Sequence, residues 1–159
     1  MCSSDLKSTG MALLALDGIT NPQNVGMIIR SAVAAGVDGL LYPAKGVAAL
    51  GPLVIKASAG NVFRAPIIRC DSAAAAVTAL KAKGYQVATL EASAATSLFE
   101  FKAAGNMVCV LGGESDGIGQ EVEALADTRL TIPMANGVES LNVAVTAALV
   151  CFHLGQTPH

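Results

Sequence analysis

The chain lacks tryptophan, has few aromatic or charged residues, and contains no apolar run long enough to cross a membrane. Only 4% of its 159 residues are aromatic and 14% are charged, whereas 53% are hydrophobic. This balance excludes an intrinsically disordered chain. Glycine, proline or a charged residue interrupts every apolar stretch, which excludes a membrane-spanning helix. A composition rich in Ala, Val, Leu and Gly is typical of a compact α/β domain of this length.

Metal-ligand spacing is also missing. The four cysteines form no CxxC or CxxH pair, and the two histidines lie at the extreme C-terminus, so we expect no metal site. Cys109 lies in a strand pattern and Cys151 in a helix pattern, which predicts buried free thiols and a reducing, cytoplasmic location. Residues 1–10 are polar and lack the apolar core of a signal peptide, which indicates a flexible leader.

The charges are unevenly distributed along the chain. The formal net charge is −2, which is unusual for a free-standing nucleic-acid binder. Residues 30–69 nevertheless carry five cations against the single carboxylate of Asp38, whereas acidic side chains dominate from Glu114 onward. This asymmetry predicts a modest basic surface that could face phosphates. The alternative is that these charges are scattered and serve only solubility.

Apolar strand patterns alternate regularly with helical patterns, which predicts a single parallel α/β domain over residues 11–159. The expected helices cover residues 25–35, 50–58, 72–83, 119–126 and 141–154. The expected strands cover residues 11–16, 38–42, 66–69, 85–90, 107–111 and 129–132.

The last predicted helix, Asn142 to Leu154, is apolar nearly all round. A helix without a polar face needs cover on every side. In a chain this short, at its C-terminal end, a partner subunit is the natural cover, which predicts a homodimer. The alternative is a helix sandwiched within the monomer.

Three polar segments follow predicted strands. Residues 17–30 form a turn with Asn, Pro and Gly that leads into a helix containing Arg30; taken alone, this could be an ordinary turn whose Arg pairs with a carboxylate. Residues 112–119 form a glycine-rich acidic loop, and residues 132–145 form a loop that leads into the last helix. Parallel strands bring such segments to one edge of a sheet, where backbone N–H groups are free.

In residue type, order and spacing, these segments resemble the three motifs of the SpoU (TrmH) family of RNA 2'-O-ribose methyltransferases, within the SPOUT superfamily. The resemblance spans roughly Leu13 to Leu154. It implies a parallel sheet flanked by helices with a C-terminal deep trefoil knot, formed by residues from about 107 to 150. It also implies S-adenosyl-L-methionine as the cofactor and a ribose 2'-hydroxyl of tRNA or rRNA as the acceptor.

The resemblance implies which side chains serve the acceptor. An arginine is effectively always protonated, so we expect it to clamp the neighbouring phosphate and to stabilise alkoxide charge, not to act as a base. The carboxylate of the second motif would fix the guanidinium, or else is only a surface carboxylate. The Ser/Asn pair of the third motif would bind substrate or support the arginine, or else only cap a helix. The matching catalytic residues are Arg30, Asn24, Glu114, Ser140 and Asn142.

Backbone groups from tight loops would bind the cofactor, and glycines allow their close approach. By resemblance Gly112, Ile132 and Leu141 match the family's cofactor-contacting positions and Met134 lines the same pocket, and Gly113 is added because it allows close approach. For Ile132 and Leu141, plain core packing is the alternative and is compatible with backbone contacts.

Two features depart from the family pattern. Asn21 stands where the family usually has Asp, and only about ten polar residues precede the first strand, where many relatives carry an RNA-binding domain. The chain could therefore be a catalytic fragment or a minimal enzyme. The rival hypothesis is a non-catalytic RNA- or S-adenosylmethionine-binding module that has lost its substrate domain. A Rossmann-type oxidoreductase is disfavoured because the glycines of residues 112–119 do not form GxGxxG.

Overall fold

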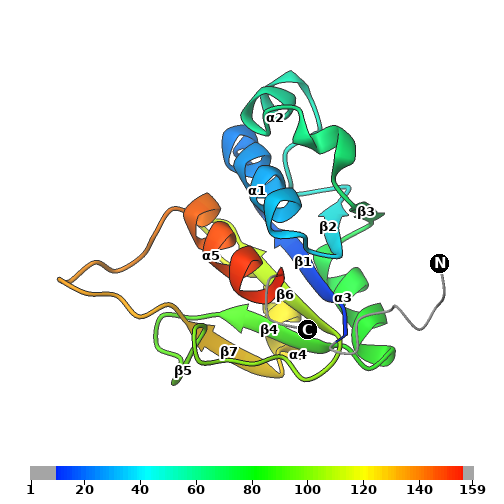
Figure 1. Ribbon diagram of the computed structural model, residues 1–159. Helices are drawn as coiled ribbons and strands as arrows, with labels where there is room; N and C mark the ends of the chain where they lie inside the picture. The colour runs from blue at the N-terminus through cyan, green and yellow to red at the C-terminus, as the bar shows by residue number, and fades with distance from the viewer. Residues whose placement is uncertain (1–9, 156–159) are drawn as a thin grey trace.

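The computed structural model describes residues 10–155, which form one seven-stranded parallel sheet with helices on both faces (Figure 1). The strand order is β3-β2-β1-β6-β4-β7-β5, and every neighbouring pair is parallel. The strands are β1 Ala12–Asp17, β2 Gly39–Pro43, β3 Ile67–Cys70, β4 Gln86–Leu90, β5 Thr96–Ser97, β6 Met107–Gly112 and β7 Thr128–Thr131. The six expected strands are confirmed; β5 has two residues, too few to show a sequence pattern.

The five expected α-helices are also confirmed. They are α1 Pro22–Ala35, α2 Pro52–Ala57, α3 Ala73–Ala82, α4 Gln120–Leu125 and α5 Val143–Gly155, and a short 3-10 helix, η2 Asn61–Arg64, was not expected. No helix within residues 10–155 has both the length and the apolarity that crossing a membrane requires. The expected leader, apart from Gly10, lies outside the described residues.

Helix α1 begins three residues earlier than predicted. The side-chain Oδ1 of Asn21 accepts hydrogen bonds from the backbone N–H groups of Gln23 (2.9 Å) and Asn24 (3.1 Å). Pro22 follows at the first helical position, where no N–H is needed. Asn21 therefore does the capping work that an Asp would do, and the turn starts the helix directly after the loop.

The central strands bury their side chains on both faces of the sheet. Leu14 and Leu16 of β1 pack with α1 and α5, whereas Leu13 and Ala15 pack with α3 and α4. This alternation follows from the two-residue repeat of a strand, and both faces must be apolar because helices cover both. Helices α1 and α5 thus share one face, on which the motif segments converge.

Helix α5 is only partly covered within the monomer. Its buried side contacts α1 and the sheet, but Val145 and Phe152 remain 49% and 43% exposed. Met27, on the neighbouring helix α1, is 42% exposed. Packing within the monomer therefore covers most of α5 and leaves Val145 and Phe152 as its exposed apolar side chains.

The expected buried thiols are confirmed for two cysteines. Cys109 of β6 and Cys151 of α5 are free and buried in the core between the sheet and α5. Burial raises the pKa of each thiol to about 12. Both therefore behave as small apolar residues rather than as nucleophiles.

Candidate functional site

The loops after β1 and β6 meet at the carboxyl edge of the sheet. The two strands pair in register, with Asp17 opposite Gly112, and the N–H of Gly113 donates to the carbonyl of Asp17 at 3.0 Å. A Cβ atom on Gly113 would lie 2.3 Å from the carbonyl oxygen of Gly18. Only glycine allows this approach of the two loops.

The loop after β6 then folds back on itself. The N–H of Gly117 donates to the carbonyl of Gly113 at 2.9 Å, and a Cβ on Gly112 would lie 2.4 Å from the carbonyl carbon of Gly117. Glu114 lies at the surface of this turn. Gly112 and Gly113, at which any Cβ atom would clash with nearby backbone, therefore set the position of the Glu114 carboxylate.

Side chains from all three polar segments meet at the start of α5. Oδ1 of Asn142 caps this helix by accepting from the N–H of Ala144 at 2.8 Å. The Nδ2 group of Asn142 donates to Oδ1 of Asn24 and to Oε1 of Glu114, each at 3.2 Å. The N–H of Val143 also donates to Oε1 of Glu114, at 3.3 Å. Capping and clustering are compatible, because the cap orients the amide so that its two donors face two acceptors.

This polar cluster borders a cavity of about 230 Å³. The cavity is lined by the β1–α1 loop, by Asn24 of α1 and by the acidic loop Gly113 to Asp116. Asn24 is 9% exposed, so its amide is largely held within the protein. The cavity offers acceptors and donors to a small polar group.

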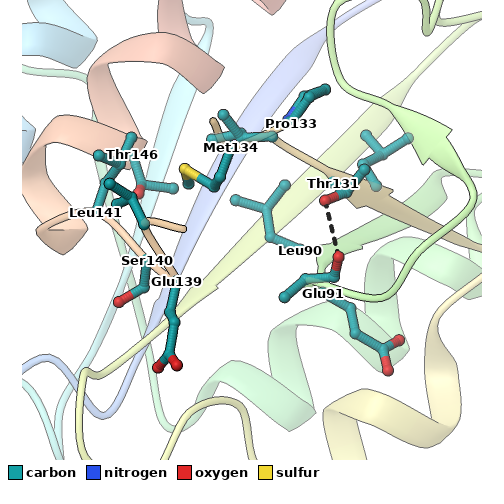
Figure 2. Close-up of a pocket in the computed structure, with 13 residues that line it drawn as sticks. Leu90, Glu91, Thr131, Pro133, Met134, Glu139, Ser140, Leu141 and Thr146 are labelled. Carbon is teal, nitrogen blue, oxygen red and sulfur yellow. Dashed lines mark hydrogen bonds between the residues drawn. The ribbon is translucent and has the colours of Figure 1, made fainter. Parts of the chain in front are cut away.

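Two larger cavities lie beside it, beneath the start of α5. Their volumes are about 490 and 510 Å³, and they share Leu90, Ser140, Leu141 and Thr146. The first extends along the end of β7 to Met134, and Figure 2 shows Leu90 and Met134 lying between Thr131 on one side and Leu141 and Thr146 on the other. The second extends along the end of β6 to Glu114. Glu91 and Glu139 also line the first cavity, but Figure 2 shows both carboxylates pointing away from Leu90 and Met134, and that of Glu91 lies 3.6 Å from Nε of Arg129.

The expected cofactor positions all line these two cavities. Ile132, Met134 and Leu141 line the first, and Gly112, Gly113 and Leu141 line the second. Ser140 lines both cavities, and it is Asn142, not Ser140, that caps α5.

Among the described residues of one chain, Arg30 and Glu114 form no hydrogen bond or ion pair, so the expectation that Glu114 fixes the guanidinium stays a prediction. Arg30 is exposed and makes no hydrogen bond or ion pair with the residues described. It lies six residues after Asn24, which on a helix is about 9 Å along the axis and on a different face. Glu114 instead accepts from Asn142 and Val143.

Several lining residues were missed by the sequence reasoning. Leu90 at the end of β4 and Thr146 of α5 line both large cavities, and Glu91 and Thr131 line the first. The available signal was that the parallel strand 85–90 must end at the same sheet edge as the motif loops. Its place between β6 and β7, however, depends on strand order, which periodicity does not reveal.

A sequence model of the SpoU rRNA Methylase family matches residues 11–152. One relative, from Staphylococcus aureus (strain COL), is 36% identical over 149 residues; its name places it in the TrmH family of tRNA/rRNA methyltransferases. The match covers 94% of this chain and 60% of that protein, so the chain spans well under two thirds of the length of this relative.

Solved structures share the fold. The SpoU methyltransferase AviRb from Streptomyces viridochromogenes, in complex with the cofactor AdoMet (S-adenosylmethionine), superposes with a TM-score of 0.81 at 25% identity, covering 96% of this chain and 62% of that one. A structure described as giving insights into the 2-OH methylation of C/U34 on tRNA has a TM-score of 0.77 at 31% identity, covering 91% and 94%.

Proposed function

This chain belongs to the SpoU rRNA methylase family, and from that membership we propose that it transfers a methyl group from S-adenosyl-L-methionine to a ribose 2'-hydroxyl of tRNA or rRNA. The observation that carries the proposal is the hydrogen-bonded cluster of Asn24, Glu114 and Asn142. It joins the three motif segments between a small polar cavity and two cavities lined by glycine and apolar residues. Acceptor and donor would meet there.

The cavities fit S-adenosyl-L-methionine in size and in chemistry. Leu90, Met134 and Leu141 offer apolar surface to an adenosyl group, and the glycine loop leaves backbone groups accessible. Glu139 lines the same space, and a carboxylate near it would favour a positively charged sulfonium, whereas the carboxylate of Glu91 is paired with Arg129. When bound, the cofactor would supply an electrophilic methyl group. The residues of this chain would hold it, orient it and exclude water.

The polar cavity would receive the ribose. Asn24 and Asn142 would fix the sugar by hydrogen bonds, and Glu114 keeps an oxygen for the 2'-hydroxyl besides the one that Asn142 and Val143 occupy. Arg30 would clamp the adjacent phosphate and offset alkoxide charge as the proton leaves, because a guanidinium keeps its own proton. Ser140 lines both large cavities, so it would contact the cofactor.

A homodimer completes this arrangement. The exposed face of α1 carries Met27 and Arg30, and α1 packs against α5, whose Val145 and Phe152 are also exposed. A second copy that covers these side chains would bury Arg30 at the interface. Since Arg30 does not reach the cluster of its own chain, we propose that it serves the site of the partner protomer.

The family topology is part of the proposal. The segment between β4 and β6 lies against the far end of α5: Nε2 of His153 is 2.8 Å from the carbonyl oxygen of Phe101, and the rings of Phe99 and His153 meet edge to face. The deep trefoil knot that we propose from the family would bring α5 against this segment, and the contact agrees with it. We further propose that residues 11–159 are a methyltransferase domain whose RNA specificity comes from another module or partner, in the cytoplasm where these RNAs reside.

Methyl transfer to RNA tests the function. The chain is incubated with methyl-tritiated cofactor and with tRNA and rRNA from cells that lack the gene, and 2'-O-methylation is mapped by resistance to alkaline hydrolysis. We expect label at a ribose with the wild type and none with Glu114→Ala. Label on a base would contradict the acceptor assignment. Cofactor binding without transfer to any RNA, even when cell extract is added to supply a partner, would favour the non-catalytic module.

A further inference from the structure

Residues 39–70 form the basic lobe of the molecule, which comprises β2, α2, η2, β3 and the loops between them. This stretch contains no Asp or Glu, and its four cations, Lys45, Lys56, Arg64 and Arg69, are all exposed. In a chain whose net charge is −2, such a stretch is a local excess of positive charge. It favours a polyanion at this surface.

An exposed aromatic ring stands within the basic lobe. The side chain of Phe63 in η2 is 79% exposed, more than any other large apolar residue described. Arg64 follows it directly, and Lys56 lies on the neighbouring helix α2. The ring of Phe63 is too exposed to contribute to a hydrophobic core, and it lies near the cations Arg64 and Lys56.

The turn that carries Phe63 is held in a defined shape. Ser58 is fully buried; its hydroxyl donates to the carbonyl of Ile55 at 2.9 Å and accepts from the N–H of Val62 at 3.3 Å. The side chain of Asn61 donates to the carbonyl of Ser58 at 2.9 Å. Ala59, at a φ of 53°, adopts a left-handed conformation that non-glycine residues rarely adopt. The ring is therefore presented by an ordered turn.

The basic lobe is fixed to the candidate site. A Cβ on Gly26 of α1 would lie 2.4 Å from the Cβ of Ala57, so α1 and α2 are in close contact, as Figure 1 shows. The N–H of Ala48 donates to the carbonyl of Ile19 at 3.2 Å, and Ile19 lines the small polar cavity. A strand of RNA whose ribose occupies that cavity can therefore continue onto the basic lobe.

We infer that Phe63 stacks on an unpaired base of the substrate RNA while Arg64 and Lys56 contact the neighbouring phosphates. This inference rests on the proposed RNA methyltransferase function, and it adds where the flanking single strand binds. Exposed aromatics beside cations are the combination that binds single-stranded RNA without reading its sequence. A symmetric contact with a second copy is disfavoured, because it would bring four cations against four cations.

Intrinsic fluorescence tests the inference directly, because the chain has no tryptophan. In Phe63→Trp the only indole reports base stacking, and Leu53→Trp provides a matched exposed position on α2. Each variant is titrated with a 12-nucleotide oligo(U) and with a 12-base-pair RNA duplex at low salt. We expect strong quenching of Phe63→Trp by the single strand, weak quenching by the duplex, and little change in Leu53→Trp with either.

Affinity measurements complete the test. By fluorescence anisotropy with labelled oligo(U), Phe63→Ala should bind about fivefold or more weakly than the wild type, and Phe63→Tyr should retain binding. Leu53→Ala should bind like the wild type. Circular dichroism checks that each variant is folded.

Equal oligo(U) affinity of Phe63→Ala and the wild type would overturn the inference. The inference would also be overturned if sedimentation showed that Phe63→Ala no longer forms a dimer while its RNA binding is unchanged, because the ring would then belong to a protein interface. The proposed activity fails separately: stacking by Phe63→Trp, with no methyl transfer by the wild type to any RNA, would remove the activity and leave the stacking surface in place.

Discussion

The basic lobe and the cavity loops after β4, β6 and β7 belong to opposite halves of the same sheet and expose side chains of opposite charge. The basic lobe carries four exposed cations, no carboxylate and the exposed ring of Phe63. The cavity loops carry glycines and the carboxylates of Glu91, Glu114 and Glu139. Between the two regions lies the hydrogen bond from Asn142 to Asn24.

The difference shows how one small domain can keep two ligands in their places. A polyanionic RNA is attracted to the basic lobe and repelled by the carboxylates, whereas a cationic sulfonium has the reverse preference. The boundary between the regions is where a nucleophile and a methyl donor would meet. Variants of either region should therefore affect one ligand and spare the other.

The largest effect is expected for Arg30, on the acceptor side of this division. Arg30→Ala should lower methyl transfer by roughly 100- to 1000-fold, because a preorganised cation for the developing charge is lost. Arg30→Lys should also fail badly, since one ammonium cannot reproduce a bidentate clamp. Cofactor binding should stay nearly intact in both variants, because Arg30 serves the acceptor. Single-turnover kinetics measure methyl transfer, and calorimetric titration measures cofactor affinity. Substantial turnover in Arg30→Lys would exclude the clamp. A loss of cofactor affinity in either variant would show that Arg30 does not serve the acceptor alone.

A charge on the exposed side of α5 tests whether the two regions work across protomers. Phe152→Glu should give monomers or insoluble protein with little transfer activity, because a carboxylate would be buried in an apolar interface. Leu53→Glu, on an exposed apolar residue of the basic lobe, is the matched control and should remain dimeric. Analytical ultracentrifugation distinguishes the species. A well-behaved wild-type monomer with full activity would refute the shared site.

The affinity for RNA should depend on salt much more strongly than the affinity for the cofactor. For three to four phosphate contacts on the basic lobe, raising monovalent salt from 50 to 200 mM should weaken RNA binding by roughly 10- to 50-fold. Cofactor affinity should change by less than about twofold, because its contacts are mainly apolar or made by the backbone. Parallel titrations with oligo(U) and with S-adenosyl-L-methionine provide the comparison. Equal salt dependence would show that charge does not divide the molecule in this way.

A smaller effect is expected from a methyl group on the glycine loop. Gly113→Ala should weaken cofactor binding by about tenfold and destabilise the fold by about 1–3 kcal/mol, because the new Cβ would lie 2.3 Å from the carbonyl oxygen of Gly18. Gly51→Ala is the control, since the nearest atom to its Cβ would be 4.0 Å away. Calorimetry and thermal unfolding measure both quantities. Unchanged cofactor affinity in a folded Gly113→Ala would place the cofactor elsewhere.

Local signals in the sequence were sufficient for most of the helices and strands, and the resemblance to the family supplied the candidate site residues. The parallel layers follow from the alternation of strand and helix patterns, whereas the start of α1 at Asn21 and Pro22 was predicted three residues too late. The three polar segments contain Asn24, Glu114 and Asn142, which the structure brings together. The elements depend on neighbouring residues in the chain, so short windows of sequence contain them, whereas these three side chains were singled out by the resemblance to the family motifs.

Only the tertiary structure decided which distant residues share a cavity. Strand order places the end of β4 between β6 and β7, and so brings Leu90 to both large cavities. The turn of α1 separates Arg30 from Asn24, although the two lie in one motif. The exposure of Phe63 depends on the hydrogen bonds of Ser58 and on the close contact of α2 with Gly26. Sequence patterns report local conformation, whereas strand order and helix packing depend on which surfaces of the whole chain can be buried together.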